Sequence, residues 1–239
     1  MHGIIMKIDP DADSAARRIH KRGKMQKASF VGGRKLNGMV QTESRLEASA
    51  IFMAMMDPRV IHIWPQPLTF DLNTGEFAAN KEDLVEKYRG SGYRPRLYTP
   101  DFRLLLKSKA AVFLEIKHSR LIERTPEVAK ITELLANLGF RHIIISEDVL
   151  WGAVDHNARL LYPYSCEAMQ PVALETILSR CHDPLKIDKL LFETNLSQRE
   201  VLQAIAHGHL ACDLQQARLG AQTVIQTAVK ETYLEMLPL

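Results

Sequence analysis

The chain has 239 residues, of which 46% are hydrophobic, and a formal net charge of +3 at pH 7. These values predict a globular protein of one or two domains with a substantial apolar core. No segment approaches the length of a membrane span, and the N-terminus lacks a secretory pattern. The three cysteines are odd in number and lack metal-binding spacing, so we expect reduced thiols in a cytoplasmic protein; they are Cys166, Cys181 and Cys212.

The charge is unevenly distributed along the chain. Residues 1–40 carry nine Lys/Arg against three acids, residues 41–159 carry sixteen of each, and residues 160–239 carry six against nine. A basic N-terminal arm, residues 1–36, suits the phosphate backbone of DNA, although a solubilising tail has the same composition. The candidate DNA-binding residues of this region are Arg17, Arg18, Lys21, Arg22, Lys24, Lys27, Arg34 and Lys35.

The first predicted helix covers residues 43–56, where Leu46, Ala50 and Met53 recur at helical spacing. Glu47 borders this apolar stripe, and a carboxylate in that position needs a partner. Two interpretations of Glu47 remain open. It is a candidate metal ligand, and with Ser44 it also forms the S-x-x-E pattern of a helix capping box.

The most informative segment predicts a hairpin of two strands, Arg103–Leu106 and Ala111–Ile116, joined by a turn at Lys107–Lys109. Side chains alternate along a strand, so Glu115 and Lys117 share one face, and Asp101 at the start of the hairpin can lie beside them. Two carboxylates and an ammonium group suit a Mg²⁺-dependent phosphodiesterase, because hard oxygens hold the metal and the lysine orients or deprotonates the attacking water. The simpler alternative is the solvated face of a sheet.

Two segments flank this hairpin. The loop from Lys87 to Arg96 interleaves basic and aromatic residues around glycines, which suits contact with DNA but also occurs in plain surface loops; its candidate contacts are Arg89, Arg94 and Arg96. After the hairpin, residues 127–138 predict a helix that ends at Gly139, and residues 142–146 predict a buried strand. The order β–α–β predicts a crossover connection.

A second unit is expected from about residue 166. Residues 170–182 and 184–193 are predicted to be helical, and the capping box at 197–200 opens a third helix that continues to His207. Residues 209–214 and 223–225 predict a small hairpin around Gly220, so the arrangement resembles a winged helix. The net charge of −3 in residues 160–239 favours protein docking over DNA binding.

Four motifs in order resemble the TnsA-type endonuclease subunit of heteromeric bacterial transposases. They are Ser44-Arg45-Leu46-Glu47, Trp64-Pro65-Gln66-Pro67-Leu68, Tyr98-Thr99-Pro100-Asp101-Phe102 and Glu115-Ile116-Lys117. The run from Lys27 to Val40 and the segment Gly139 to Asp148 are also similar to that family, so the resemblance covers roughly residues 25–165.

The resemblance implies an α/β, restriction-endonuclease-like catalytic domain, residues 37–165, with a mixed sheet flanked by helices and a winged-helix-like domain at residues 166–239. It implies a catalytic acid at Glu47, a metal-bridging acid at Asp101 and a catalytic lysine at Lys117. Gln66 matches a glutamine often found near such sites. Glu115 and the backbone carbonyl of Ile116 would complete a set of ligands for Mg²⁺ or Mn²⁺.

The resemblance further implies cleavage of the 5′, non-transferred strand of double-stranded DNA at transposon ends. A DDE transposase of the TnsB type would cut and join the 3′ ends, and an AAA+ ATPase regulator of the TnsC type would bind the C-terminal domain. Two alternatives remain: a stand-alone nuclease of the same superfamily acting in repair or restriction, and a non-catalytic adaptor that binds DNA or transposition proteins.

Overall fold

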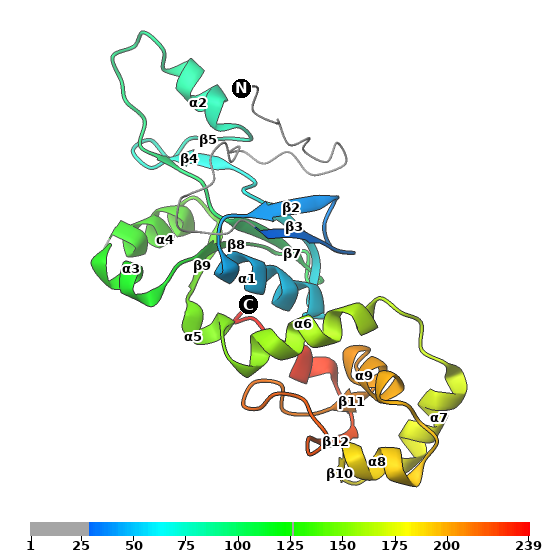
Figure 1. Cartoon of the computed structure of the whole chain (residues 1–239). Coiled ribbons are helices and arrows are strands. Elements are labelled where there is room, and N and C mark those ends of the chain that lie inside the picture. Colours follow the sequence, from blue (N-terminus) through cyan, green and yellow to red (C-terminus); the bar gives the residue numbers. More distant parts are fainter. Residues whose placement is uncertain (1–28, 126) are drawn as a thin grey trace, which may run out of the picture. The chain divides into compact units, whose positions relative to one another are not determined.

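The computed structural model describes residues 29–125 and 127–239, and these form two compact units (Figure 1). Of the described residues, the first unit contains 29–48 and 60–148, and the second contains 49–59 and 149–239. The chain is an α/β protein with a mixed sheet and flanking helices, as predicted. Within the described ranges, no helix combines the length and apolar character needed to cross a membrane.

The centre of the first unit is a four-stranded sheet in the order β3-β7-β8-β9. It consists of β3 (Val60–Pro65), β7 (Phe102–Leu106), β8 (Ala111–Ile116) and β9 (Arg141–Ile145). The β3–β7 and β7–β8 pairs are antiparallel, whereas β8 and β9 are parallel, which makes the sheet mixed. The predicted β7–β8 hairpin is confirmed.

The sequence explains the positions of these strands. In β7, Phe102, Leu104 and Leu106 are buried and alternate with half-buried residues, which is the pattern of a strand with one face on the core. In β8, three consecutive residues are buried, Val112 to Leu114, as expected for a strand covered on both faces. Because these two strands are antiparallel, the start of β7 and the end of β8, where the candidate acids lie, are at the same end of the two central strands of the sheet.

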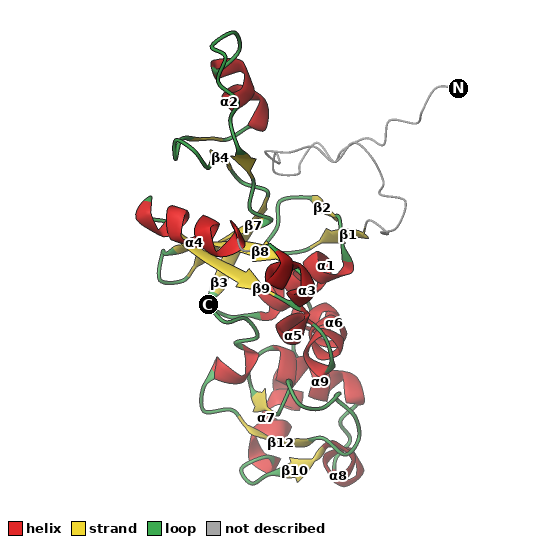
Figure 2. Cartoon of the chain, turned by 90° about the vertical axis from the view of Figure 1, so that its left-hand side faces the viewer, coloured by secondary structure: helices red, strands yellow, loops and turns green. Residues whose placement is uncertain are grey.

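The parallel pair requires a crossover, and α3 (Ser119–Arg124) and α4 (Glu127–Asn137) provide it. Gly139 follows α4 with a φ of +81°, a left-handed conformation that favours glycine and ends the helix as predicted. Leu135 of α4 packs with Phe70 and Phe113 in the fully buried core of this unit. Figure 2 shows α4 alongside β9, and the β–α–β prediction is confirmed.

The remaining elements of the first unit flank the central sheet in sequence. A hairpin of β1 (Ser29–Gly32) and β2 (Met39–Thr42) precedes α1 (Arg45–Met56), of which residues 45–48 belong to the first unit and residues 49–56 to the second. A small sheet in the order β5-β4-β6 consists of β4 (Thr69–Asp71), β5 (Phe77–Ala78) and β6 (Leu97–Tyr98), with α2 (Lys81–Lys87) between its last two strands in sequence. Because β1 is a paired strand, the part of the predicted arm from residue 29 onward belongs to the fold, and residues 1–28 lie outside the described residues.

The second unit contains most of the helices of the C-terminal half. They are α6 (Ala153–Ser165), α7 (Pro171–Arg180), α8 (Ile187–Glu193) and α9 (Gln198–Ala206), and α5 (Glu147–Leu150) precedes them at the unit boundary. The capping box at Ser197 and Glu200 forms as predicted. A three-stranded antiparallel sheet has the order β10-β12-β11, with β10 (Leu185–Lys186), β11 (Leu210–Ala211) and β12 (Val224–Thr227).

Two details of this unit differ from the sequence prediction. Residues 185–186 form a strand that pairs with β12, so the helix predicted from Pro184 begins only at Ile187. The predicted boundary at residue 165 also differs from the observed grouping, because α6 packs against α9 and therefore joins the C-terminal unit. Asn157 of α6 ties the helix to the segment between β11 and β12, because its side chain donates to the carbonyls of Leu214 and Ala217 and accepts the N–H of Leu219.

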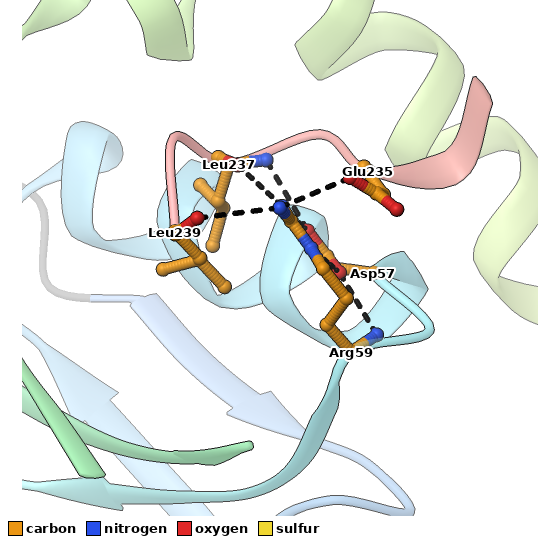
Figure 3. Close-up of polar contacts among 5 residues, drawn as sticks. All are labelled: Asp57, Arg59, Glu235, Leu237 and Leu239. Carbon is orange, nitrogen blue, oxygen red and sulfur yellow. Dashed lines mark hydrogen bonds and ion pairs between the residues drawn. The ribbon is translucent and has the colours of Figure 1, made fainter. Parts of the chain in front are cut away.

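The last residues of the chain are held within the second unit. A short 3₁₀ helix (Glu231–Leu234) precedes Leu237, whose carbonyl accepts a hydrogen bond from Arg59 (Figure 3). Asp57 is fully buried, lies 2.7 Å from the Arg59 guanidinium and accepts the N–H of Leu237. Residues 57–59 therefore group with the C-terminal segment although about 180 residues separate them in sequence.

Candidate active site

The β7–β8 hairpin brings the predicted acids together. Asp101 directly precedes β7, and its Oδ2 accepts the backbone N–H of Ile116 at 2.7 Å. Within the described residues, this is the only hydrogen bond made by the Asp101 carboxylate. Glu115 is the residue before Ile116 and Lys117 the residue after it. The Pro-Asp and E-x-K motifs, separated in the sequence, are therefore in contact where β7 begins and β8 ends.

Glu115 and Lys117 lie on the same side of the chain, as strand alternation predicted. The Lys117 Nζ atom is 3.8 Å from Glu115 Oε1, and both side chains are partly buried. The other oxygen of Glu115, Oε2, accepts a hydrogen bond from the Tyr98 hydroxyl at 2.8 Å. The backbone N–H of Lys117 donates to the Ile145 carbonyl of β9. This bond fixes the lysine backbone directly after the end of β8. The two oxygens of Glu115 therefore have different neighbours.

Asp101 lies in an electrostatically unfavourable place. Burial is the main factor that raises the pKa of its carboxyl well above the usual range, and the negative charge of Glu115 raises it further. Glu47 and Glu43 also raise it, so both lie close enough to act on Asp101, while the N–H of Ile116 lowers it. Crowded carboxylates without a cation are costly, and this arrangement is typical of functional sites.

The structure supports the capping interpretation of Glu47 without removing its carboxylate from the site. Glu47 folds back over the start of α1, where its Oε2 accepts the Glu43 N–H at 2.8 Å and its Oε1 accepts the Ser44 hydroxyl at 2.8 Å. Ser44 in turn accepts the Glu47 N–H at 3.2 Å. The carboxylate thus caps the helix, and its charge still reaches Asp101.

Gln66 lies next to Asp101, directly after the end of β3. The strand β3 ends at Pro65, and Gln66 follows with a φ of +41°, a left-handed conformation that is uncommon for a residue with a side chain. Its N–H donates to the Asp101 carbonyl at 2.7 Å. Its Oε1 atom is buried and has no hydrogen-bond partner among the described residues. Strained backbone and an unsatisfied buried acceptor are both features of functional positions.

Few carboxylates among the described residues are available near Asp101 to bind a divalent metal. In residues 29–125 and 127–239, no group of three or more His, Cys, Asp and Glu side chains is close enough to form a metal site. The donor chemistry nevertheless suits Mg²⁺, because Asp101 and Glu115 offer carboxylate oxygens and Mg²⁺ uses few protein ligands together with waters and substrate phosphate. The unfavourable concentration of negative charge at Asp101 would be relieved by a cation.

Residues that the sequence analysis did not assign also support this site. The backbone N–H and hydroxyl of Ser119 donate to Glu147 at 2.8 and 2.6 Å. His118 caps the start of α3, and its Nδ1 lies 2.9 Å from Glu147 Oε1. These contacts hold the chain directly after Lys117. No sequence pattern indicated them, because Glu147 is 28 residues away from Ser119.

The predicted DNA-binding residues fall into four groups. Arg94 and Arg96 are exposed, and neither guanidinium has a partner within the described residues. Arg89 pairs with Glu86 at 2.6 Å, and the loop tyrosines bind acids, Tyr88 with Glu76 and Tyr93 with Asp71. Arg34 and Lys35 lie in the turn between β1 and β2, whereas the earlier residues lie outside the described residues: Arg17, Arg18, Lys21, Arg22, Lys24 and Lys27.

Comparison with known proteins adds no identification. No protein-family model matches the chain, and no curated protein is significantly similar to it.

Proposed function

We propose that the chain is a metal-dependent DNA endonuclease, the TnsA-type subunit that cuts the non-transferred strand in a heteromeric transposase. The observation that carries the proposal is the meeting of Asp101, Glu115 and Lys117 at one end of the β7–β8 hairpin. Carboxylates beside a lysine, in a place where added negative charge is unfavourable, suit a phosphodiesterase that uses Mg²⁺ or Mn²⁺.

Asp101 and Glu115 would hold the metal, with the Ile116 carbonyl as a further donor. When bound, Mg²⁺ supplies Lewis-acid chemistry at the phosphate and eases loss of a proton from the attacking water. Glu47 would contribute mainly through its charge, because its carboxylate is engaged in capping α1. In the described part of the chain, Gln66 has a buried amide oxygen without a hydrogen-bond partner beside Asp101. A water molecule bound at the site would donate a hydrogen bond to it.

The chain itself would orient the reactants. Lys117 directly follows the end of β8 and its backbone is tied to β9, so its ammonium has a restricted range of positions near Glu115. In this position it would hold the attacking water by a hydrogen bond and offset the negative charge that develops on the phosphate oxygens. The contacts of Glu147 to Ser119 would keep this lysine in place during the reaction.

The fold agrees with this function in two places. A mixed sheet with an antiparallel hairpin and a parallel crossover is compatible with a restriction-endonuclease-like domain. In the second unit, the order α7, β10, α8, α9, β11, β12 is the helix–strand–helix–helix–strand–strand order of a winged helix. The strand β10, absent from the sequence prediction, supports the winged-helix resemblance.

We propose the following division of contacts. The exposed Arg94 and Arg96 bind the phosphates of double-stranded transposon-end DNA, together with the basic arm. The winged-helix-like unit binds protein, because residues 160–239 carry a net charge of −3, and its partner is the AAA+ ATPase regulator of the TnsC type. The DDE transposase of the TnsB type joins the assembly on the DNA.

The test is strand-specific cleavage. A plasmid carrying transposon ends is incubated with the DDE transposase and ATPase of the same element, Mg²⁺, and either the wild-type chain or Asp101→Asn. The proposal expects 5′-strand cuts that require both Mg²⁺ and Asp101. Cleavage that is equal in the two proteins contradicts it, and a sequence-specific cut by the chain alone selects the stand-alone nuclease instead.

A non-catalytic adaptor is the second candidate. It is favoured by the finding that no group of three metal-ligating side chains exists among the described residues. An adaptor would assemble with DNA and its partners in the same plasmid experiment, and Asp101→Asn would then leave both assembly and end cleavage unchanged.

A further inference from the structure

A chain of three polar side chains leads away from Glu115 into the core of the first unit. Tyr98 of β6 contacts Glu115 Oε2 at 2.8 Å and His142 Nε2 at 2.9 Å. The other ring nitrogen of His142, Nδ1, is 2.9 Å from the hydroxyl of Thr132 on α4. Glu115, Tyr98, His142 and Thr132 come from four different elements, so only the folded sheet and crossover bring them together.

The hydrogen-bonding capacities of these groups fix the direction of every bond. An ionised Glu115 can only accept, so the single hydroxyl hydrogen of Tyr98 is donated to it. The Tyr98 oxygen must then accept from His142, which places the imidazole hydrogen on Nε2. Nδ1 is left as an acceptor and receives the Thr132 hydroxyl hydrogen.

The surroundings of His142 agree with one hydrogen on the ring. The side chain is buried, with 8% of its surface exposed, and burial lowers the pKa of His142 to about 4. The imidazole is therefore neutral near pH 7 and carries one donor and one acceptor. A second possible bond of Thr132, to the Val128 carbonyl, is longer at 3.4 Å and does not compete effectively with the 2.9 Å contact.

We propose that Thr132, His142 and Tyr98 form a positioning relay that fixes the rotation of the Glu115 carboxylate. The proposal rests on the proposed function, in which Glu115 helps to hold the metal. The relay holds Oε2 and leaves Oε1 facing Lys117 at 3.8 Å, so one defined oxygen is presented at the site. Hydrogen-bonded partners of this kind orient metal ligands, and their loss typically costs about 10- to 100-fold in metal affinity or activity.

The first experiment determines where the imidazole hydrogen lies. Long-range ¹H–¹⁵N spectra of the full chain labelled with ¹⁵N-histidine, at pH 7, distinguish the two neutral tautomers, and a His142→Gln sample assigns the signals. The relay requires His142 as the Nε2–H tautomer. In Tyr98→Phe, which removes its acceptor, the Nε2 shift should move away from the wild-type value.

The second experiment measures Mn²⁺ binding by the electron paramagnetic resonance signal of the free ion. Tyr98→Phe keeps the ring but removes the hydroxyl, and we expect its Mn²⁺ dissociation constant to rise about tenfold. Thr132→Val should raise it by less, because it acts two bonds further from Glu115. Tyr233→Phe is the matched control, since it removes a phenol hydrogen bond to the Ile205 carbonyl in the other unit and should bind Mn²⁺ like the wild type.

The outcomes separate the relay from the function on which it rests. If wild type binds Mn²⁺ and Tyr98→Phe binds it equally well, the relay has no positioning role and the proposal is overturned. An Nδ1–H tautomer or an imidazolium at pH 7 overturns it as well. If wild type binds no Mn²⁺, the proposed metal site fails, and the tautomer of His142 still decides the direction of the relay.

Discussion

Three aspartates in the two units of the molecule differ in whether they are paired with a cation. In the second unit, Asp57 is fully buried and lies 2.7 Å from the Arg59 guanidinium, and Asp155 lies 2.7 Å from Arg159. In the first unit, Asp101 has no ion pair within the described residues and is instead surrounded by the charges of other acids. The second unit pairs these two buried acids with arginine, whereas the first unit places Asp101 beside other acids without an ion pair to it among the described residues.

We interpret the difference as follows: the paired acids of the second unit stabilise the fold, whereas the acids around Asp101 are arranged to bind a ligand. A buried carboxylate paired with arginine is satisfied when the chain folds, and breaking the pair leaves an uncompensated charge. A carboxyl whose pKa is raised by burial and by neighbouring acids, as at Asp101, is unfavourable when ionised unless a proton or a cation neutralises it. We therefore expect mutations of the two groups to have opposite effects on stability.

The largest effect should follow Asp101→Asn. Under the proposed function, cleavage in the complete assembly should fall by about a thousandfold or more, because losing the proposed metal ligand would remove several kcal/mol of transition-state stabilisation. The melting temperature at pH 7 should rise, since the pKa of Asp101 is raised and its ionised form is the unfavourable one at neutral pH. Retained cleavage, or a large fall in melting temperature, would show that Asp101 is structural.

Arg59→Ala should have the opposite effect. It leaves Asp57 buried without its partner and releases the Leu237 carbonyl and Glu235, so we expect a loss of about 3–5 kcal/mol in the free energy of unfolding, measured in urea. The matched control is Arg89→Ala, which breaks an exposed pair with Glu86 and should cost less than about 1 kcal/mol. Equal losses in the two variants contradict the distinction.

Lys117→Ala should reduce the rate of cleavage about 10²- to 10³-fold without lowering the melting temperature, because the role proposed for it is to stabilise charge in the reaction. Lys117→Arg should not restore activity, since a planar guanidinium does not replace a compact ammonium. Lys130→Ala, an exposed lysine on α4, is the control for loss of charge. A Lys117→Ala protein that cleaves normally but melts earlier would make the lysine a structural residue.

Arg94 and Arg96 should contribute non-specific affinity for DNA. If both touch phosphate, the slope of log affinity against log salt should become shallower by about 2 units in the double variant to glutamine, as two counterions are no longer released. Arg218→Gln, an exposed arginine of the second unit, should leave the slope unchanged. The opposite pattern would assign DNA binding to the second unit instead.

The smallest effect should be the acid dependence contributed by Asp71. Burial raises its pKa, but hydrogen bonds from Tyr93, Asn73 and Thr74 outweigh burial, and the pKa is lowered overall. Because the folded pKa lies below the unfolded value, Asp71 stabilises the fold above about pH 4, and this contribution is lost as the pH falls through the folded pKa. Asp71→Asn should flatten the fall in melting temperature between pH 5 and pH 3, whereas Asp83→Asn should not.

The sequence predicted the parts of this fold that depend on local patterns. The β7–β8 hairpin, α4 with its glycine stop, and the capping box of α9 all follow from alternation, helix periodicity or a four-residue motif. The proximity of Asp101 and Glu115 could be predicted from the sequence, because a hairpin sets which residues of its two strands lie opposite each other.

The parts that could not be predicted depend on long-range packing. Tyr98 and His142 are 44 residues apart, and their contact requires both the small sheet and the crossover to form. The two-residue strand β10 is too short to give a pattern, and nothing local shows that residues 49–59 belong with the C-terminal unit. The left-handed Gln66 was also missed, because glutamine rarely adopts that conformation.

We propose that the carboxylates around Asp101 hold a divalent cation. The most direct test of this claim is a titration of Mn²⁺ into wild-type protein and Asp101→Asn at pH 7, with the free ion measured by electron paramagnetic resonance and Asp83→Asn as control. We predict that wild type and Asp83→Asn remove Mn²⁺ from the free signal, whereas Asp101→Asn does not. Equal binding by all three proteins, or no binding by wild type, would contradict the claim.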